Sequence, residues 1–192
     1  AINIPEIVSY TLAKLSGLDD LAVEAATLQA FQLYRISIYD ILSDSHFEKN
    51  GRRTILHYGP SQLAVLDNVL EQKISEAAER LQKVGFEGAE TLARRQYLEV
   101  IEQDKLRNSI DPLAQDEETV HRIIDLVAGT HGRYLGLLST RNSELINFAV
   151  YLARAMHTLE DLLDFVSGED RTRPKVTLPL FYFNHAPNHL SE

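Results

Sequence analysis

The chain has no cysteine among its 192 residues. It therefore has no disulfide bond, no thiolate nucleophile and no cysteine-ligated zinc site. No apolar run approaches the roughly 18–20 residues that cross a bilayer, so we expect no transmembrane segment. A secretory signal pattern is also lacking. The absence of cysteine does not by itself show whether the protein resides in a reducing or an oxidising compartment. We expect a cytoplasmic location, because a reducing cytosol is the default for such a chain.

Basic charge is scarce as well. The chain has 19 Lys and Arg against 28 Asp and Glu, which gives a formal net charge of −9. Nucleic-acid binding requires a basic stripe, so we expect no nucleic-acid partner. An acidic balance is compatible with binding cations. No glycine-rich phosphate loop, Ser-His-Asp order or HExxH motif is present, which excludes the enzyme classes that depend on them.

What the sequence does contain is helical periodicity. Its 9 glycines and 6 prolines fall mostly between long windows with apolar residues spaced by three and four. Length and a hydrophobic content of 44% predict one all-α domain over residues 1–192. We expect helices at 4–16, 19–44, 60–84, 87–108, 116–140, 142–167 and 177–184. Because the chain begins at Ala1 without an initiator methionine, we expect a processed or truncated N-terminus.

The predicted helix 142–167 carries two apolar stripes, and a helix that is apolar nearly all round is buried. Its second stripe ends in His157, Glu160, Asp161 and Asp164, at spacings that place them together. The first stripe comprises Leu145, Phe148, Leu152, Ala155, Leu159, Leu162 and Phe165 or Val166. We therefore predict an acidic cluster at the end of a buried face.

The predicted helix 19–44 ends in a second pair of acids, Asp40 and Asp44, spaced by four. Carboxylates at a helix C-terminus oppose the helix dipole, and buried unpaired carboxylates are costly, so we expect a cation near them. Acids on two helices suit Mg²⁺, which binds one or two carboxylates and leaves positions for substrate phosphates. A solvated acidic surface on each helix is the alternative.

Two irregular stretches, 45–59 and 168–176, are basic. Arg52, Arg53 and Lys175 are candidates for binding a diphosphate, because cationic side chains pair strongly with phosphate oxygens. A solvated surface pair is the alternative for the two arginines. Five histidines are expected as surface or packing residues: His46, His57, His121, His131 and His157.

A family resemblance enters with residues 153–183, ARAMHTLEDLLDFVSGEDRTRPKVTLPLFYF. This segment resembles the second aspartate-rich helix of the trans-isoprenyl (polyprenyl) diphosphate synthases, in which DDxxD is followed by a lysine and a TLP segment. Here Glu160, Asp161 and Asp164 occupy the DDxxD positions, and Lys175 precedes the TLP segment.

Further segments follow in the family's order. Residues 33–59, LYRISIYDILSDSHFEKNGRRTILHYG, resemble the helix with the first aspartate-rich motif and the arginine pair, histidine and YG after it. Residues 127–138, VAGTHGRYLGLL, resemble the stretch that begins with Lys-Thr. Gln103 with Asp104 resembles a Gly-Gln…Asp pattern more weakly.

The resemblance, which covers about residues 20–184, implies an antiparallel helical bundle of the isoprenoid synthase type around a central cavity. It implies Mg²⁺ ions that join two acidic motifs to the diphosphate of an isoprenoid substrate, and a homodimer or a heterodimer with an active synthase. The implied metal ligands are Asp40, Asp44, Glu160, Asp161 and Asp164. Other cavity candidates are Tyr39, Ser43, His57, Gln103, Thr130 and His157.

The chain departs from the family at working positions. Tyr39 and Ser43 stand where the first motif has aspartates, Thr130 where the family has a diphosphate-binding lysine, and His157 where it has glutamine. Each lost charge-stabilising group typically costs about 3–4 kcal/mol of transition-state stabilisation. We therefore expect a polyprenyl-synthetase-like protein with weak or no prenyltransferase activity, acting as an accessory or regulatory subunit.

Two alternatives remain open. One is an active Mg²⁺-dependent prenyltransferase that condenses an allylic diphosphate with isopentenyl diphosphate. The other is a non-enzymatic helical interaction module, for which neither metal nor diphosphate has any effect.

Overall fold

The computed structural model describes residues 4–43, 48–49, 52–111, 115–168 and 176–185, and these are almost entirely helical. The α-helices in these described residues are α1 (Ile4–Leu15), α2 (Asp19–Ser43), α3 (Pro60–Lys83), α4 (Ala89–Ser109), α5 (Glu117–Leu137), α6 (Ser143–Ser167) and α8 (Leu178–His185). The predicted all-α class is confirmed, and each predicted helix agrees with an observed one to within a few residues. None of the helices described is both long and apolar enough to span a membrane.

The stretch 45–59, which we expected to be irregular, contains short ordered elements. Strand β1 (Glu48–Lys49) pairs in antiparallel fashion with β2 (Arg52–Arg53), with Glu48 opposite Arg53. A 3₁₀-helix, η1 (Ile55–Tyr58), follows and leads into α3. Strands of two residues are too short to produce the alternation by which a strand is recognised in a sequence.

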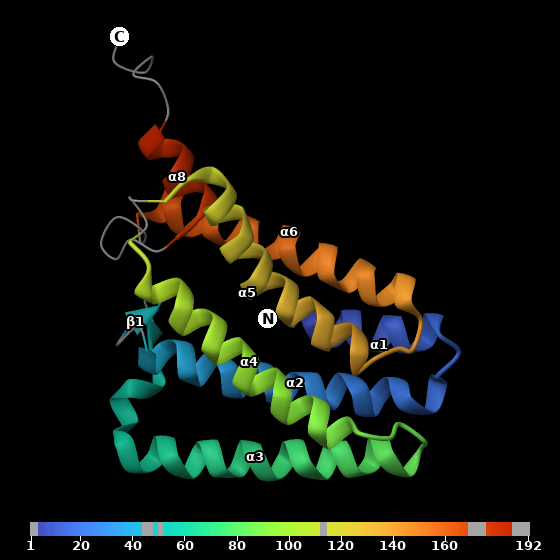
Figure 1. Cartoon of the computed structure of the whole chain (residues 1–192). Coiled ribbons are helices and arrows are strands. Elements are labelled where there is room, and N and C mark those ends of the chain that lie inside the picture. The colour runs from blue at the N-terminus through green and yellow to red at the C-terminus, as the bar shows by residue number, and fades with distance from the viewer. Residues whose placement is uncertain (1–3, 44–47, 50–51, 112–114, 169–175, 186–192) are drawn as a thin grey trace.

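The long helices pack as an up-and-down bundle, so that alternate helices share a direction. In Figure 1, α2, α4 and α6 all end at the same side of the molecule, whereas α3 and α5 run the opposite way. The C-terminal ends of α2, α4 and α6 therefore lie together.

Side-chain caps fix where two of the helices begin. Asp116 accepts a hydrogen bond from the Thr119 amide at the start of α5, and Asn142 accepts one from the Glu144 amide at the start of α6.

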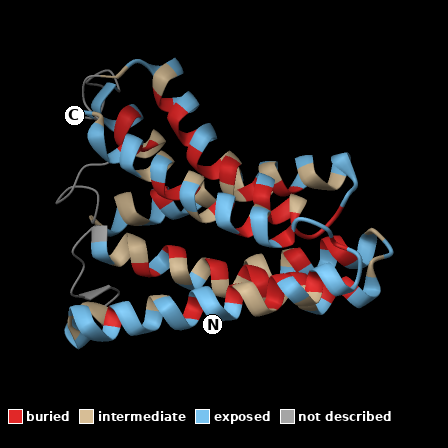
Figure 2. Ribbon diagram, turned by 60° about the horizontal axis from the view of Figure 1, so that its bottom comes forward, coloured by how far each residue is buried: buried red, intermediate tan, exposed pale blue. Residues whose placement is uncertain are grey.

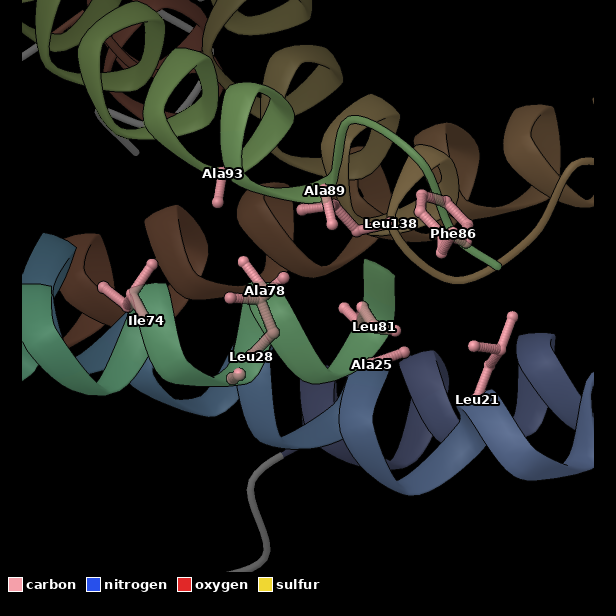
Figure 3. Close-up of a cluster of buried hydrophobic side chains, with 11 residues drawn as sticks. Leu21, Ala25, Leu28, Ile74, Ala78, Leu81, Phe86, Ala89, Ala93 and Leu138 are labelled. Atoms are coloured by element: carbon pink, nitrogen blue, oxygen red, sulfur yellow. The ribbon is translucent and has the colours of Figure 1, made fainter. Parts of the chain in front are cut away.

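The largest buried cluster lies between α2, α3 and α4 (Figure 3). Alanines at Ala25, Ala77, Ala78 and Ala93 are wholly buried, and they let these helices approach closely. Leu138, which follows α5, reaches the same cluster. Figure 2 shows that burial is concentrated along these inward faces.

Helices α5 and α6 touch through two glycines. A Cβ atom added to Gly132 would lie 2.5 Å from the Ala149 carbonyl oxygen, and one added to Gly136 would lie 2.8 Å from the Ile146 Cα atom. Both distances are far inside van der Waals contact, so only glycine permits this spacing. The close contact holds α6 against the bundle and positions its acidic end.

The expectation that helix 142–167 is buried all round is wrong. Within α6 only Ala149 and Asp161 are buried. Most of its first stripe faces outward: Phe148, Ala155, Leu159, Leu162 and Val166 are exposed. Leu145 instead packs against a buried cluster, and Leu152 lines a cavity. Tyr151 and Leu163, beside the stripe, are exposed as well. The two apolar stripes therefore do not correspond to one buried helix, because much of the first is open on the outer face.

Candidate functional site

A cavity of about 360 Å³ lies between α1, α2, α4, α5 and α6. Its volume falls in the range of about 300–1,000 Å³ that small-molecule sites occupy. About half of the residues that line it are apolar, among them Val8, Leu33, Ile36, Val100, Val127, Leu135, Leu152 and Met156. The other half are polar or charged, so the cavity has both apolar and polar walls.

One end of this cavity is acidic. Asp40 from α2, Asp104 from α4, and Glu160 and Asp164 from α6 line it. Asp40 and Asp164 lie in the last turn of their helices, where the helix dipole adds partial negative charge, and Asp104 and Glu160 lie one to two turns earlier. The last turns of α2 and α6 contain no basic residue. Glu160 is exposed, so this acidic end is where the cavity meets solvent.

Arg107 from α4 provides a positive charge beside these acids. Its Nη2 atom donates to Asp161 Oδ1 at 2.9 Å, and each of the two residues is only 6% exposed. Its Nε atom donates to the Val176 carbonyl oxygen at 3.0 Å. Arg107 therefore links α4, α6 and the segment before α8.

The third contact of Arg107 is with a histidine. Arg107 Nη1 lies 3.2 Å from His157 Nε2. Because a guanidinium only donates hydrogen bonds, His157 Nε2 is the acceptor in this contact. The Arg107–Asp161 pair, with His157 beside it, therefore forms a polar wall between the acidic end and the apolar interior.

His131 lies further inside, on α5. It lines the cavity, and none of the residues that the structure describes hydrogen-bonds to its ring. Burial, and to a smaller extent the neighbouring His157, lowers the pKa of His131 from 6.5 to about 4. This imidazole is therefore neutral at physiological pH.

Two buried glutamines line the end opposite the acids. Gln96 Nε2 donates to Gln29 Oε1 at 3.2 Å, and Gln29 Nε2 makes a long hydrogen bond of 3.5 Å to the Tyr134 carbonyl oxygen. Gln96 is 1% exposed, and its Oε1 atom has no hydrogen-bond partner among the residues described. The inner end is thus polar but uncharged.

The donor set at the acidic end fits a hard cation such as Mg²⁺, because every candidate ligand is a carboxylate oxygen. Across residues 4–43, 48–49, 52–111, 115–168 and 176–185, no three His, Asp or Glu side chains form a group able to hold a metal ion. Mg²⁺ often uses one or two carboxylates and completes its shell with ligand phosphates and water. The residues therefore fit a cation held jointly with a ligand, and do not form a closed protein site.

The structure brings together most of the candidate metal ligands. Asp40, Glu160, Asp161 and Asp164 line one cavity, and His157 lies beside them. Asp44 and Lys175 lie outside the described residues, and only the backbone is described for Ser43, Arg52 and Arg53. Whether any of these residues binds a metal or a diphosphate stays a prediction.

Four other candidates lie off the cavity. Tyr39 lines a separate cleft between α2, η1, α3 and Tyr97 of α4, because one residue along a helix rotates the side chain by about 100°. His57 is exposed on η1, as expected for a surface histidine. Gln103 and Thr130 are on α4 and α5, but neither lines the cavity.

Two residues of the cavity, Arg107 and His131, were not predicted as site residues from the sequence. A signal for Arg107 existed, because it continues the buried spacing of Ala93, Gln96 and Val100 along α4. A charged residue on a buried face requires a partner.

No protein-family model and no curated protein match this chain.

Proposed function

We propose that this chain is an isoprenoid-diphosphate-binding protein of the polyprenyl synthase type, with weak or no prenyltransferase activity, that acts as an accessory or regulatory subunit. The observation that carries the proposal is one cavity with an apolar interior and an acidic, solvent-facing end. An isoprenoid tail suits the apolar walls. A diphosphate is repelled by carboxylates unless cations lie between them, and Mg²⁺ is the cation that this ligand set suits.

Binding and catalysis make different demands on this site. When bound, the metal would stabilise the negative charge that develops on a departing diphosphate. Asp161 is already balanced by Arg107 at 2.9 Å, so its charge is less available to a metal. Asp40 is the residue of the first motif that lines the cavity, whereas Tyr39 lies in a separate cleft. These features support a protein that binds an isoprenoid diphosphate but only weakly promotes the departure of its diphosphate group.

The outward stripe of α6 supports a subunit role. Its exposed side chains include Tyr151 at 67% and Val166 at 74% exposure. Exposed apolar side chains gathered on one helix are a feature of protein–protein contact sites. The same helix contributes Glu160 and Asp164 to the cavity. A partner protein bound to its outer face would therefore contact the helix that carries part of the acidic end.

A second candidate function is an active Mg²⁺-dependent prenyltransferase. It is favoured by the convergence of Asp40, Glu160 and Asp164 on one cavity. Product formation from geranyl diphosphate and isopentenyl diphosphate, measured with the purified chain and Mg²⁺, separates the two. We expect product only at trace level. Competent turnover that is lost in Glu160→Gln, but not in the exposed control Glu144→Gln at the start of α6, would replace the first proposal by the second.

A further inference from the structure

We propose that a second copy of this chain covers the outer face of α6, and that the two copies pair through this helix as an antiparallel, two-fold symmetric dimer. This inference rests on the subunit role in the proposed function and names the partner. The outer face consists of six large apolar side chains, Phe148, Tyr151, Leu159, Leu162, Leu163 and Val166.

The first step is the pattern of the outer face. Successive residues of a helix are rotated by about 100°, so these six side chains fall within about one third of the circumference of α6. Leu152 and Ala155 are the other residues in that arc between positions 148 and 166, and both are apolar too. The surface helix of a monomeric protein turns a polar face to solvent, whereas α6 turns Glu160 and Asp164 toward the cavity. The outer face therefore has the composition of a surface that packs against another helix.

The second step is the size of the outer face. Leu162 is the least exposed of the six side chains, at 46%, and Val166 is the most exposed, at 74%. The apolar surface continues onto α8, because the ring of the exposed Phe183 lies 5.3 Å from the ring of Phe165. Since a large side chain presents about 150–250 Å² when fully open, the whole surface is on the order of 800 Å². That area exceeds the largest apolar patch of a typical monomer, about 300–600 Å², and matches the roughly 800 Å² that each partner contributes to a standard interface.

The third step is charge, which bears on the choice of partner. Residues that flank a contact between two helices select the partner helix by their charges. The flanking positions of α6 are occupied by Ala149, Met156, Thr158 and Phe165, none of which is charged. Two copies are therefore not repelled along this face, although each has a formal net charge of −9. A different protein selected by charge would find no charge to pair with at these positions.

The fourth step is the fit of the outer face to itself. A two-fold axis perpendicular to α6 at the level of His157 brings Phe148 opposite the partner's Val166, because the two positions lie equally far from it along the helix. For the same reason it brings Ala155 opposite the partner's Leu159. A large side chain thus meets a smaller one at both places. A face that complements itself in this way is what a two-fold symmetric dimer requires.

A lipid surface is the other broad class of partner for an apolar helix face. Helices that lie on membranes carry lysine and arginine along their polar face. Arg154 is the one such residue of α6, and its Nε atom pairs with Asp125 at 3.0 Å. The remaining formally charged residues of α6 are acidic. The charge of this helix therefore favours a protein partner over a membrane.

The first test is sedimentation velocity of the purified chain at about 1–100 µM. We expect a dimer, and we expect Leu159→Glu to raise the dimer dissociation constant by about thirtyfold or more, because it would bury a charge in the contact. Leu98→Glu is the matched control, since Leu98 on α4 is 54% exposed against 56% for Leu159, and should leave the dimer unchanged. A wild-type chain that stays monomeric, or a dimer that Leu98→Glu dissociates and Leu159→Glu does not, would overturn the inference.

The second test is cysteine crosslinking, which the chain permits because it has no cysteine of its own. Phe148→Cys combined with Val166→Cys should give covalent dimers on mild oxidation, since each new thiol faces the other type across the contact. Each single variant should give none, because its two thiols lie at opposite ends of the antiparallel helices. Covalent dimers from the single variants would indicate parallel helices and contradict the proposed arrangement.

A calorimetric titration separates this inference from the proposed function. Leu159 does not line the cavity, so Leu159→Glu should bind geranyl thiolodiphosphate with Mg²⁺ as tightly as the wild-type chain does. A wild-type chain that binds this probe but stays monomeric would overturn only the dimer. A monomer that also sediments with phosphatidylcholine vesicles would assign the outer face to a lipid surface instead. A dimer that does not bind the probe would overturn the proposed ligand and leave the dimer standing.

Discussion

The guanidinium of Arg107 and the carboxylate of Asp161 form an ion pair, 2.9 Å apart, that is almost wholly buried between α4 and α6. Asp161 belongs to the segment that resembles a metal-binding motif. In this chain its charge is balanced by a protein side chain. The acidic end of the cavity therefore has fewer carboxylates available for cations than the sequence alone suggests.

Removing Arg107 should be strongly destabilising. Arg107→Met leaves the Asp161 charge buried without its partner, and we expect the free energy of unfolding in urea to fall by about 3–5 kcal/mol. Replacing both residues, as Arg107→Met with Asp161→Leu, should recover most of that loss. Arg133→Met is the control, because Arg133 pairs with Glu99 on the surface and should cost less than about 1 kcal/mol. Similar losses for the two single arginine variants would show that burial of the Arg107–Asp161 pair is unimportant.

The close contact of α5 and α6 gives a second prediction. Gly132→Ala should destabilise the protein by about 1–3 kcal/mol, because its Cβ would lie 2.5 Å from the Ala149 carbonyl oxygen. Gly129→Ala, on the same helix, meets its nearest atom at 3.7 Å and should stabilise by about 0.5–1 kcal/mol through helix propensity. Denaturant unfolding of both variants tests the packing, and an equal effect would contradict it.

Filling the cavity should block ligand binding without harming the fold. Ala153 lines the cavity from α6, whereas Ala155 is exposed on the outer face of the same helix. We expect Ala153→Leu to weaken binding of geranyl thiolodiphosphate with Mg²⁺ by about tenfold or more, measured by calorimetry. Ala155→Leu should leave the affinity unchanged. Unaltered binding by Ala153→Leu would place the ligand elsewhere.

The low pKa of His131 predicts a specific dependence of stability on pH. The unfolded ring titrates near 6.5 and the folded ring near 4, so between these values the unfolded state binds more protons. Stability should therefore fall as the pH drops from about 6.5 to about 4, by about 3 kcal/mol from this residue. Above pH 6.5 the ring is neutral in both states and contributes no dependence. The difference in unfolding free energy between wild type and His131→Leu, measured across this range, isolates the effect, and a flat difference would disprove it.

The helices could be predicted from sequence because their apolar spacing and capping residues are local features. Asp116 and Asn142 sit where the starts of α5 and α6 were expected, and both cap as their types suggest. The gathering of Asp40 with Glu160 and Asp164 follows from helix direction, since α2 and α6 end at the same side of the bundle.

What the sequence could not show depends on rotation and partners. Tyr39 and Asp40 are neighbours in the chain, but the rotation of the helix places Asp40 in the cavity and Tyr39 in the separate cleft. The pairing of Arg107 with Asp161 joins residues 54 positions apart. An apolar stripe on α6 predicts burial, but the pattern cannot show whether the surface that would cover it belongs to the same chain or to another protein.

The central claim is that the cavity binds an isoprenoid diphosphate together with Mg²⁺. The most direct measurement is the thermal unfolding midpoint with Mg²⁺ and geranyl thiolodiphosphate, added singly and together. A ligand that binds only the folded state raises the midpoint. We predict a rise that requires both, because the acidic end repels the diphosphate without a cation. No rise with both present would contradict the claim.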